Sequence, residues 1–222
     1  MGKPVKITDQ NKDWFLKQPS TKRRFRTRPQ RERYLIVCEG EKTEPNYFIA
    51  LSAILPRNLV NIKIKGLGSN TLSLVEAATS LRDIASCSDY PYDHVWVVFD
   101  KDSFPAYDFD NAINAAEARG MTAAWSNEAF EIWYILHFEE RITGMSRTEF
   151  KGKLTSHLGT RYKKNSQEMY TLLQKLGNED DAVRRAKRLH ELHLGLPPSR
   201  SNPCTHVNKL VTELNEYKIP TE

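Results

Sequence analysis

Two apolar stretches that end in carboxylates, YLIVCEGE at residues 34–41 and HVWVVFDKD at residues 94–102, decide the fold of this chain. The apolar part of each is short, rich in β-branched or aromatic residues and bounded by polar ones, which is typical of a strand buried on both faces. In an open parallel sheet the functional crevice lies beyond the carboxyl ends of the strands. We therefore expect the acids that follow the two strands to lie together at one end of the sheet.

Strand and helix patterns alternate from Arg33 onward, which predicts an α/β fold with a parallel sheet covered by helices on both faces. A strand at about 59–65 alternates apolar and polar residues, so we place it near an edge of the sheet. The expected strands are 34–38, 59–65, 94–99 and 121–125, and the expected helices are 43–55, 71–87, 107–119 and 129–138.

Beyond residue 140 the patterns predict helices alone. We therefore divide the chain into a basic, partly disordered arm at 1–32, an α/β domain at 33–140 and a helical extension at 141–222 that packs on the α/β domain. The helices expected in the extension lie near 146–158, 166–176, 178–194 and 204–217.

The net charge of +5 is unevenly distributed along the chain. Residues 1–33 carry eleven Lys and Arg against three acids, a net charge of +8, and the rest of the chain carries −3. Such an arm suits a polyanion, because neutralised phosphates release condensed counterions. A solubilising tail is the alternative, but Trp14, Phe15 and Phe25 favour contact with bases. The candidate nucleic-acid contacts in the arm are Lys22, Arg23, Arg24, Arg26 and Arg28.

The composition indicates a cytoplasmic protein. No stretch approaches the roughly 20 apolar residues that span a bilayer, and the first residues have no apolar core of a signal peptide. Cys38, Cys87 and Cys204 are odd in number and widely spaced, so we interpret them as reduced structural thiols. His190 and His193 are three residues apart rather than four, which excludes the zinc-protease motif.

Asp100 and Asp102 are the first candidate metal ligands. On an extended chain alternate side chains share a face, with Cα atoms roughly 6.6 Å apart, so both carboxylates would reach one ion or hold a pair of ions. Hard oxygen ligands of this kind suit Mg²⁺ or Mn²⁺. An Asp-x-Asp pair alone is common in surface loops, and it is Glu39 at the end of the other strand that makes a metal site the better interpretation.

Residues 40–45 lead from the first strand into a helix. Gly40 lets the backbone bend, Thr43 is the expected N-cap and Pro45 suits the first helical turn. Glu44 has two interpretations that the sequence leaves open: it complements the helix dipole, or it binds metal opposite Glu39. Glu41 is expected to face solvent.

These residues resemble a known family. The order of Glu39-Gly40 and Asp100-x-Asp102 is similar to the Toprim domain of topoisomerases, primases and OLD-type nucleases. The more specific resemblance is to the RloB-like proteins, small bacterial Toprim proteins found among restriction and phage-defence loci. It extends from about residue 33 to 214 and is carried by segments 38–48 (CEGEKTEPNYF), 99–102 (FDKD), 126–138 (SNEAFEIWYILHF), 162–165 (YKKN) and 202–211 (NPCTHVNKLV).

The resemblance implies a Toprim-like sheet and roles for particular residues. Glu39, Asp100 and Asp102 would be catalytic and metal-binding, Glu44 would be a further ligand, and Lys164 would stabilise charge on the phosphate, with Lys163 as the near alternative. Ligands of a second ion would come from Ser126, Glu128 and Glu131, of which we favour Glu131 because it lies on an otherwise apolar helix face. Lys101 and Lys163 are added to the expected nucleic-acid contacts.

We therefore expect a nuclease that uses one or two Mg²⁺ or Mn²⁺ ions on DNA or RNA. The resemblance further implies a role in bacterial phage defence or restriction, with a partner protein of that system. Two alternatives remain: a Toprim-type phosphotransfer enzyme that is not a nuclease, and a nucleic-acid-binding protein without turnover. The choice of DNA or RNA and the oligomeric state are not determined by the sequence.

Overall fold

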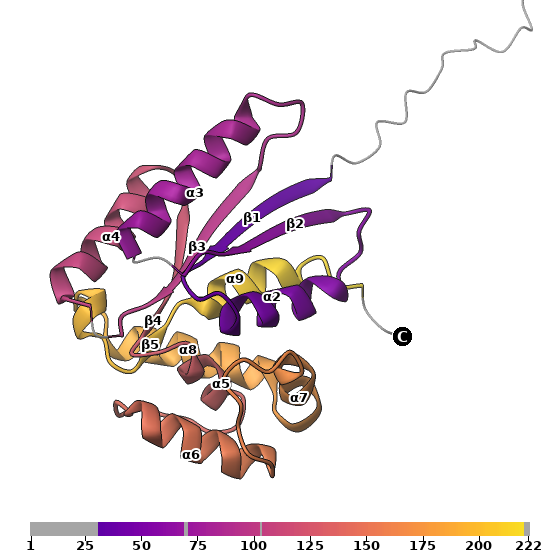
Figure 1. Ribbon diagram of the computed structural model, residues 1–222. Coiled ribbons are helices and arrows are strands. Elements are labelled where there is room, and N and C mark those ends of the chain that lie inside the picture. The colour runs from indigo at the N-terminus through magenta and orange to yellow at the C-terminus, as the bar shows by residue number, and fades with distance from the viewer. Residues whose placement is uncertain (1–30, 69–70, 103, 220–222) are drawn as a thin grey trace, which may run out of the picture. The chain divides into compact units, whose positions relative to one another are not determined.

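The computed structural model describes residues 31–68, 71–102 and 104–219, and a five-stranded sheet lies at the centre of this part of the chain (Figure 1). The strand order is β2-β1-β3-β4-β5; the first three pairings are parallel and the last is antiparallel. The four parallel strands and the edge position of β2 confirm the sequence-based prediction. The strands are β1 (Glu32–Cys38), β2 (Val60–Gly66), β3 (His94–Asp100), β4 (Thr122–Asn127) and β5 (Cys204–Thr205).

The two central strands have side chains that are almost fully removed from solvent. All five residues from Tyr34 to Cys38 are 0% exposed, and Val97, Val98 and Phe99 are also 0% exposed. Strands covered on both faces need such continuous apolar runs, which is why these segments were recognisable in the sequence. Truncating one of these side chains to alanine is expected to cost about 2–5 kcal/mol of stability.

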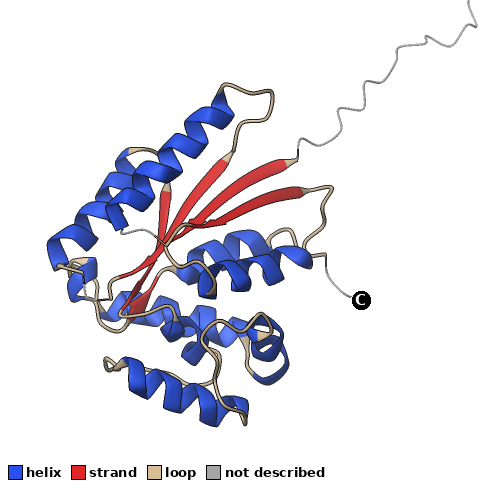
Figure 2. Cartoon of the chain, viewed as in Figure 1, coloured by secondary structure: helices blue, strands red, loops and turns tan. Residues whose placement is uncertain are grey.

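Helices cover both faces of the sheet, as the alternating pattern predicts (Figure 2). Figure 1 shows α2 (Thr43–Ala53) and α9 (Val207–Asn215) on one face, and α3 (Thr71–Ser86) and α4 (Ala106–Ala118) on the other. The chain moves from β1 to β2 in one direction and then back past β1 to β3. Because crossovers are right-handed, this reversal puts α2 and α3 on opposite faces.

The prediction that only helices follow residue 140 is wrong at one point. β5 pairs with β4 through residues 204 and 205, and the last helix begins at Val207 rather than at 204. A strand of two residues is too short to show a periodic pattern, so nothing local revealed it. The helices between α4 and α9 are α5 (Glu131–Leu136), α6 (Arg147–Leu158), α7 (Met169–Leu176), α8 (Glu179–Leu192) and a short 3₁₀ helix, η2 (Pro198–Arg200).

Residues 31–222 belong to one compact unit, so the extension and the sheet share a core. Trp133 and Ile135 of α5, Leu189 of α8 and Leu210 of α9 are buried with the sheet residues in a single apolar cluster. No helix within the described ranges has both the length and the apolar composition needed to cross a membrane.

Candidate active site

The strand order reverses between β1 and β3, and this reversal defines a crevice at their carboxyl ends. In open α/β sheets ligands bind at such a switch point, because the helices that follow the two strands lie on opposite faces and leave a gap. Glu39 comes directly after β1, and Asp100 is the last residue of β3. Both acids therefore lie at the position where this fold binds ligands.

Glu39 and Asp100 are in direct contact. The backbone N–H of Glu39 donates to the Val98 carbonyl at 2.8 Å, which continues the β1–β3 pairing by one residue. The backbone N–H of Asp100 then donates to Oε2 of Glu39 at 3.2 Å. The acids that the sequence places after two separate strands thus lie side by side.

Glu44, in the first turn of α2, folds back toward the same point. A Cβ on residue 40 would lie within 3.0 Å of both carboxylate oxygens of Glu44, so Gly40 provides the space for this side chain. Glu44 is 6% exposed. Its Oε2 and Oδ1 of Asp100 are buried without a hydrogen-bond partner. A buried carboxylate oxygen left unpaired is costly unless a cation or a proton occupies it.

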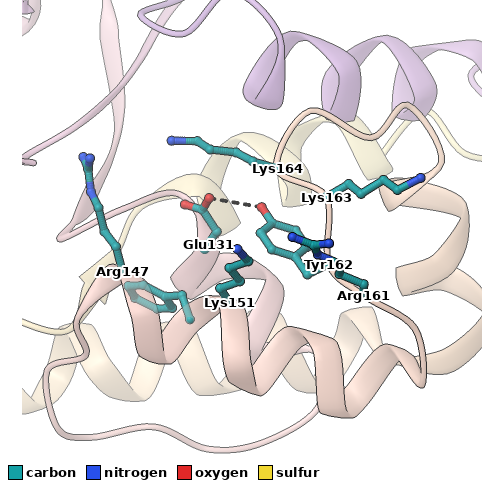
Figure 3. Close-up of a pocket in the computed structure, with 8 residues that line it drawn as sticks. Glu131, Arg147, Lys151, Arg161, Tyr162, Lys163 and Lys164 are labelled. Carbon is teal, nitrogen blue, oxygen red and sulfur yellow. Dashed lines mark hydrogen bonds between the residues drawn. The ribbon is translucent and has the colours of Figure 1, made fainter.

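Glu131 lies in the first turn of α5, and its charge raises the pKa of both Asp100 and Glu44. It is 6% exposed, and its Oε1 accepts a hydrogen bond of 3.1 Å from the hydroxyl of Tyr162 (Figure 3). We refer to Glu39, Glu44, Asp100 and Glu131 as the acidic cluster. The cluster joins the ends of two strands to the first turns of two helices.

Burial and mutual repulsion raise the pKa of three acids in the cluster. Burial, followed by the charges of Glu44 and Asp102, raises the pKa of Glu39 to about 7, although the Asp100 N–H opposes the shift. The pKa of Asp100 is raised well above its ordinary value by burial and then by Glu44 and Glu131. Burial and Glu131 also raise the pKa of Glu44, and Lys164 partly offsets this.

A divalent cation fits this donor set, because it would pair with the two orphaned oxygens and remove the repulsion. Carboxylates alone suit Mg²⁺ or Mn²⁺. The acids do not form a tight group. Among the described residues, the ligand atoms that lie within 4.8 Å of one another in a group of three belong to His190, Cys204 and His206. The acids would therefore close in on an ion or hold it partly through water, as Mg²⁺ commonly requires.

Asp102 departs from the predicted geometry. β3 ends at Asp100, and Asp102 has a φ of 41°, so the extended chain that would align the two carboxylates is interrupted. Aspartate tolerates this left-handed conformation better than most residues. Its side chain is 36% exposed and forms an ion pair with Arg147 of α6. The turn is held by the N–H of Asp102, which donates to the Glu128 carbonyl at 3.0 Å.

The other predicted site residues are more scattered. Ser126 is buried in the sheet, and its hydroxyl is hydrogen-bonded to that of Thr205 at 3.0 Å rather than directed to the acids. Glu128 is partly exposed and contacts Asp102 through its backbone. Lys101 is partly exposed, and its N–H donates to the Ser126 carbonyl at 2.9 Å.

The arm residues Lys22, Arg23, Arg24, Arg26 and Arg28 lie outside the described residues.

A cavity of about 370 Å³ opens beside Glu131 and has a strongly basic wall (Figure 3). We call it the cationic cavity. Figure 3 shows Lys164 extending toward the side of Glu131 and Arg147, whereas Lys163 extends in the opposite direction. A second hollow, of about 350 Å³, lies over Gly40 and Glu44, and Lys164 lines it too. The residues that line the cationic cavity are Glu131, Arg147, Phe150, Lys151, Arg161, Tyr162, Lys163 and Lys164.

The loop that carries Lys164 is anchored to α2. The hydroxyl of Thr43 donates to the Lys164 carbonyl at 3.2 Å, and the Asn46 amide donates to the Asn165 carbonyl at 3.1 Å. The expectation that Thr43 caps α2 is wrong, because Lys42 occupies the N-cap position and Thr43 is the first helical residue. Its hydroxyl fixes the lysine loop instead.

Arg147 and Tyr162 are the site residues that sequence reasoning missed. Ser146 and Glu149 form a capping box that starts α6 at Arg147, and this motif is visible in the sequence. The motif predicts where the helix begins, but nothing in it connects Arg147 to Asp102. Tyr162 stands beside the predicted lysines, yet only the fold brings its hydroxyl to Glu131.

Comparisons with known proteins agree with the resemblance noted in the sequence. The family model described as RloB-like protein matches residues 34–214, which is well over half of the chain. No curated protein and no solved structure matches the chain.

Proposed function

The chain belongs to the RloB-like protein family, and from this premise we propose that it is a metal-dependent nuclease that hydrolyses phosphodiester bonds in DNA or RNA. The observation that carries the proposal is the contact of Glu39 with Asp100 at the switch point of the sheet, beside buried and unpaired oxygens of Asp100 and Glu44. Placing these acids together does not stabilise the fold, because the negative charge of each carboxylate raises the pKa of its neighbours.

Glu39, Glu44 and Asp100 would hold one Mg²⁺ or Mn²⁺ ion, and Glu131 and Asp102 would contribute to a second. When bound, such ions supply Lewis acidity toward the phosphate and ease ionisation of the attacking water. The similarity of Glu39-Gly40 and Asp100-x-Asp102 to Toprim and OLD-type enzymes supports this choice of chemistry.

The side chains of the chain itself have separate tasks in this proposal. Glu39 would act as a ligand: without an ion burial raises its pKa to about 7, and a bound cation would hold the carboxylate in its ionised form. Lys164 lies between the acidic cluster and the cationic cavity, where its ammonium group would stabilise charge on a phosphate oxygen. The guanidinium of Arg147 orients Asp102 and faces the same cavity.

The cationic cavity favours nucleic acid as the substrate. Five of its eight lining residues are Lys or Arg. Clustered positive side chains of this kind suit the phosphate backbone of a nucleic acid. The basic N-terminal arm, with its net charge of +8 over residues 1–33, would supply phosphate contacts of its own. Action in a phage-defence system, together with a partner protein, is part of the same proposal.

The test is cleavage by the purified full-length protein of a panel of plasmid DNA, single-stranded DNA, tRNA and free nucleotides, with Mg²⁺ or Mn²⁺. Asp100→Asn and Glu39→Gln should each lose at least about 10²-fold of the metal-dependent rate while remaining folded. Asp108→Asn, an exposed acid in the first turn of α4, is the matched control and should retain the rate. Undiminished cleavage by both cluster variants, or no cleavage of any substrate, would reject the proposal.

A further inference from the structure

Three metal-ligating side chains from three separate elements meet away from the acidic cluster. His190 lies in the last turn of α8, Cys204 is the first residue of β5, and His206 is the N-cap of α9. Their ligand atoms all lie within 4.8 Å of one another, and Nε2 of His206 is 2.9 Å from Nδ1 of His190. We propose that His190, Cys204 and His206 bind a zinc ion that fastens α8, β5 and α9 together.

The spacing of the three atoms is close to what zinc requires. With Zn–N bonds of about 2.0–2.1 Å and a Zn–S bond of about 2.3 Å, ligand atoms in a tetrahedral site lie roughly 3.3–3.6 Å apart. The two imidazole nitrogens, 2.9 Å apart, are already somewhat closer than this, and a sulfur at the 4.8 Å limit would have to approach by about 1.2 Å. Rotation of the exposed His190 side chain adjusts the distances from its own nitrogen to the other two ligands without disturbing the core.

The donor set selects zinc rather than the hard cation expected at the acidic cluster. Two imidazoles and a thiolate suit zinc, whereas Mg²⁺ prefers oxygen ligands. Cys204 is 0% exposed, and His206 packs against the Trp125 ring at 4.2 Å between centroids, so two of the three ligands are held in place. His190 is exposed, which provides an entry path and leaves a fourth position for water or a further ligand.

Both histidines of the site are in the neutral form that a metal ligand needs. Lys209 is the nearby cation: its charge, after burial, lowers the pKa of both His190 and His206. Both imidazoles are therefore neutral, as metal ligands must be. Burial raises the pKa of the Cys204 thiol to about 11, so zinc binding would release its proton, and the thiolate would offset the charge of Lys209.

Zinc at this position would add to a strand pairing that is short. β5 has two residues, and its pairing with β4 is limited to Ser126 with Thr205 and Asn127 with Cys204. One further bond, from the His206 N–H to the Trp125 carbonyl at 2.8 Å, continues this attachment. Because a metal bound only by the folded chain stabilises that state, zinc would hold the last strand and helix on the sheet.

The test uses the full-length protein, purified without chelator, with zinc content measured and Co²⁺ substituted as a spectroscopic probe. We expect one zinc per chain, a thiolate-to-Co²⁺ charge-transfer band, and a lower melting temperature after the metal is removed. Cys204→Ser and His206→Asn should lose the band. His190→Asn should weaken zinc binding as well. Because His190 is exposed, this variant should fold even if the other two do not.

Two controls separate this site from the rest of the molecule. Cys87→Ser removes the exposed thiol, and Asp100→Asn alters the acidic cluster; both should retain the zinc and the band. The wild-type protein without zinc or a band, or a band that survives Cys204→Ser, would overturn the proposal and leave a hydrogen-bonded histidine pair beside a buried thiol. Neither result depends on nuclease activity, so the two proposals fail independently.

Discussion

The acidic cluster and the cationic cavity are adjacent but are built in opposite ways. The acids come from strand ends and first helical turns, and both Glu44 and Glu131 are 6% exposed. The cations extend from the surface of α6 and from the loop at 161–164, where they are exposed. A largely buried set of acids suits a small ion, whereas long exposed cations adapt to a flexible polyanion.

Two interactions link the two regions. Tyr162 of the cavity donates to Glu131, and Lys164 lowers the pKa of Glu44; Arg147 pairs with Asp102, which lies outside the cluster. The regions should nevertheless respond differently to salt, because exposed charges are screened and buried ones are screened much less. Weakened nucleic-acid binding with unchanged metal binding at high salt is therefore the expected pattern.

Lys164 and Lys163 provide the strongest test of whether the two regions act together. Both are exposed lysines that line the cationic cavity, but only Lys164 also lines the hollow over Glu44. We expect Lys164→Met to lower kcat by about 10²-fold, because the lost ammonium group would act on the reacting phosphate. Lys163→Met should mainly raise KM. Equal losses of kcat in the two variants would mean that Lys164 serves only as one of several binding charges.

The sequence was sufficient to predict the four parallel strands of the sheet and to place Glu39 beside Asp100. Parallel strands buried on both faces have continuous apolar runs, and acids directly after such runs must lie at one end of the sheet. Glu39 and Asp100 could be placed together for this reason alone. Gly40 was recognised as permissive, although its specific purpose, space for the Glu44 carboxylate, appears only in the structure.

The rest of the site depends on contacts between distant segments, which no local pattern encodes. Asp102 was expected on the same face as Asp100, but the chain turns at φ 41° immediately after the strand. Arg147 and Tyr162 reach the site from the helical extension. β5 is too short for a pattern, so the sequence does not predict that Cys204 lies beside His190 or that the metal-ligating neighbour of His190 is His206 rather than His193.

Glu39→Gln tests how strongly burial of an ionised carboxylate in the acidic cluster destabilises the fold. The pKa of Glu39 is about 7 in the folded protein against an ordinary 4.5, so the folded state binds this proton more tightly than the unfolded state. Without a divalent ion, the stability that protonated Glu39 contributes is therefore fully present below about pH 4.5 and is lost as the pH rises through about 7. Asp100 and Glu44 shift in the same direction.

At about pH 8 in metal-free buffer, Glu39→Gln should be more stable than the wild type by about 1–2 kcal/mol, a value reduced for the partial exposure of Glu39. The difference should shrink at about pH 5 and after addition of Mg²⁺ to the wild type. Urea unfolding at both pH values measures it. Glu41→Gln, an exposed acid in the same loop, should show no such gain, and a similar gain there would show that the effect is not specific to the cluster.

Tyr162→Phe should have the smallest effect, because it removes a single hydrogen bond between the two regions. The hydroxyl of Tyr162 donates to Oε1 of Glu131, and without it the carboxylate is held less firmly. A net loss of about 1 kcal/mol corresponds to roughly a fivefold fall in cleavage rate at limiting Mg²⁺. Higher Mg²⁺ should restore the rate, since the variant keeps the Glu131 carboxylate and loses only the bond that positions it.

Tyr170→Phe removes a buried hydroxyl that has no hydrogen-bond partner, so it should leave the rate unchanged. A Tyr162→Phe variant that saturating Mg²⁺ does not rescue would instead assign the hydroxyl to substrate binding, and the cationic cavity would then act on its own.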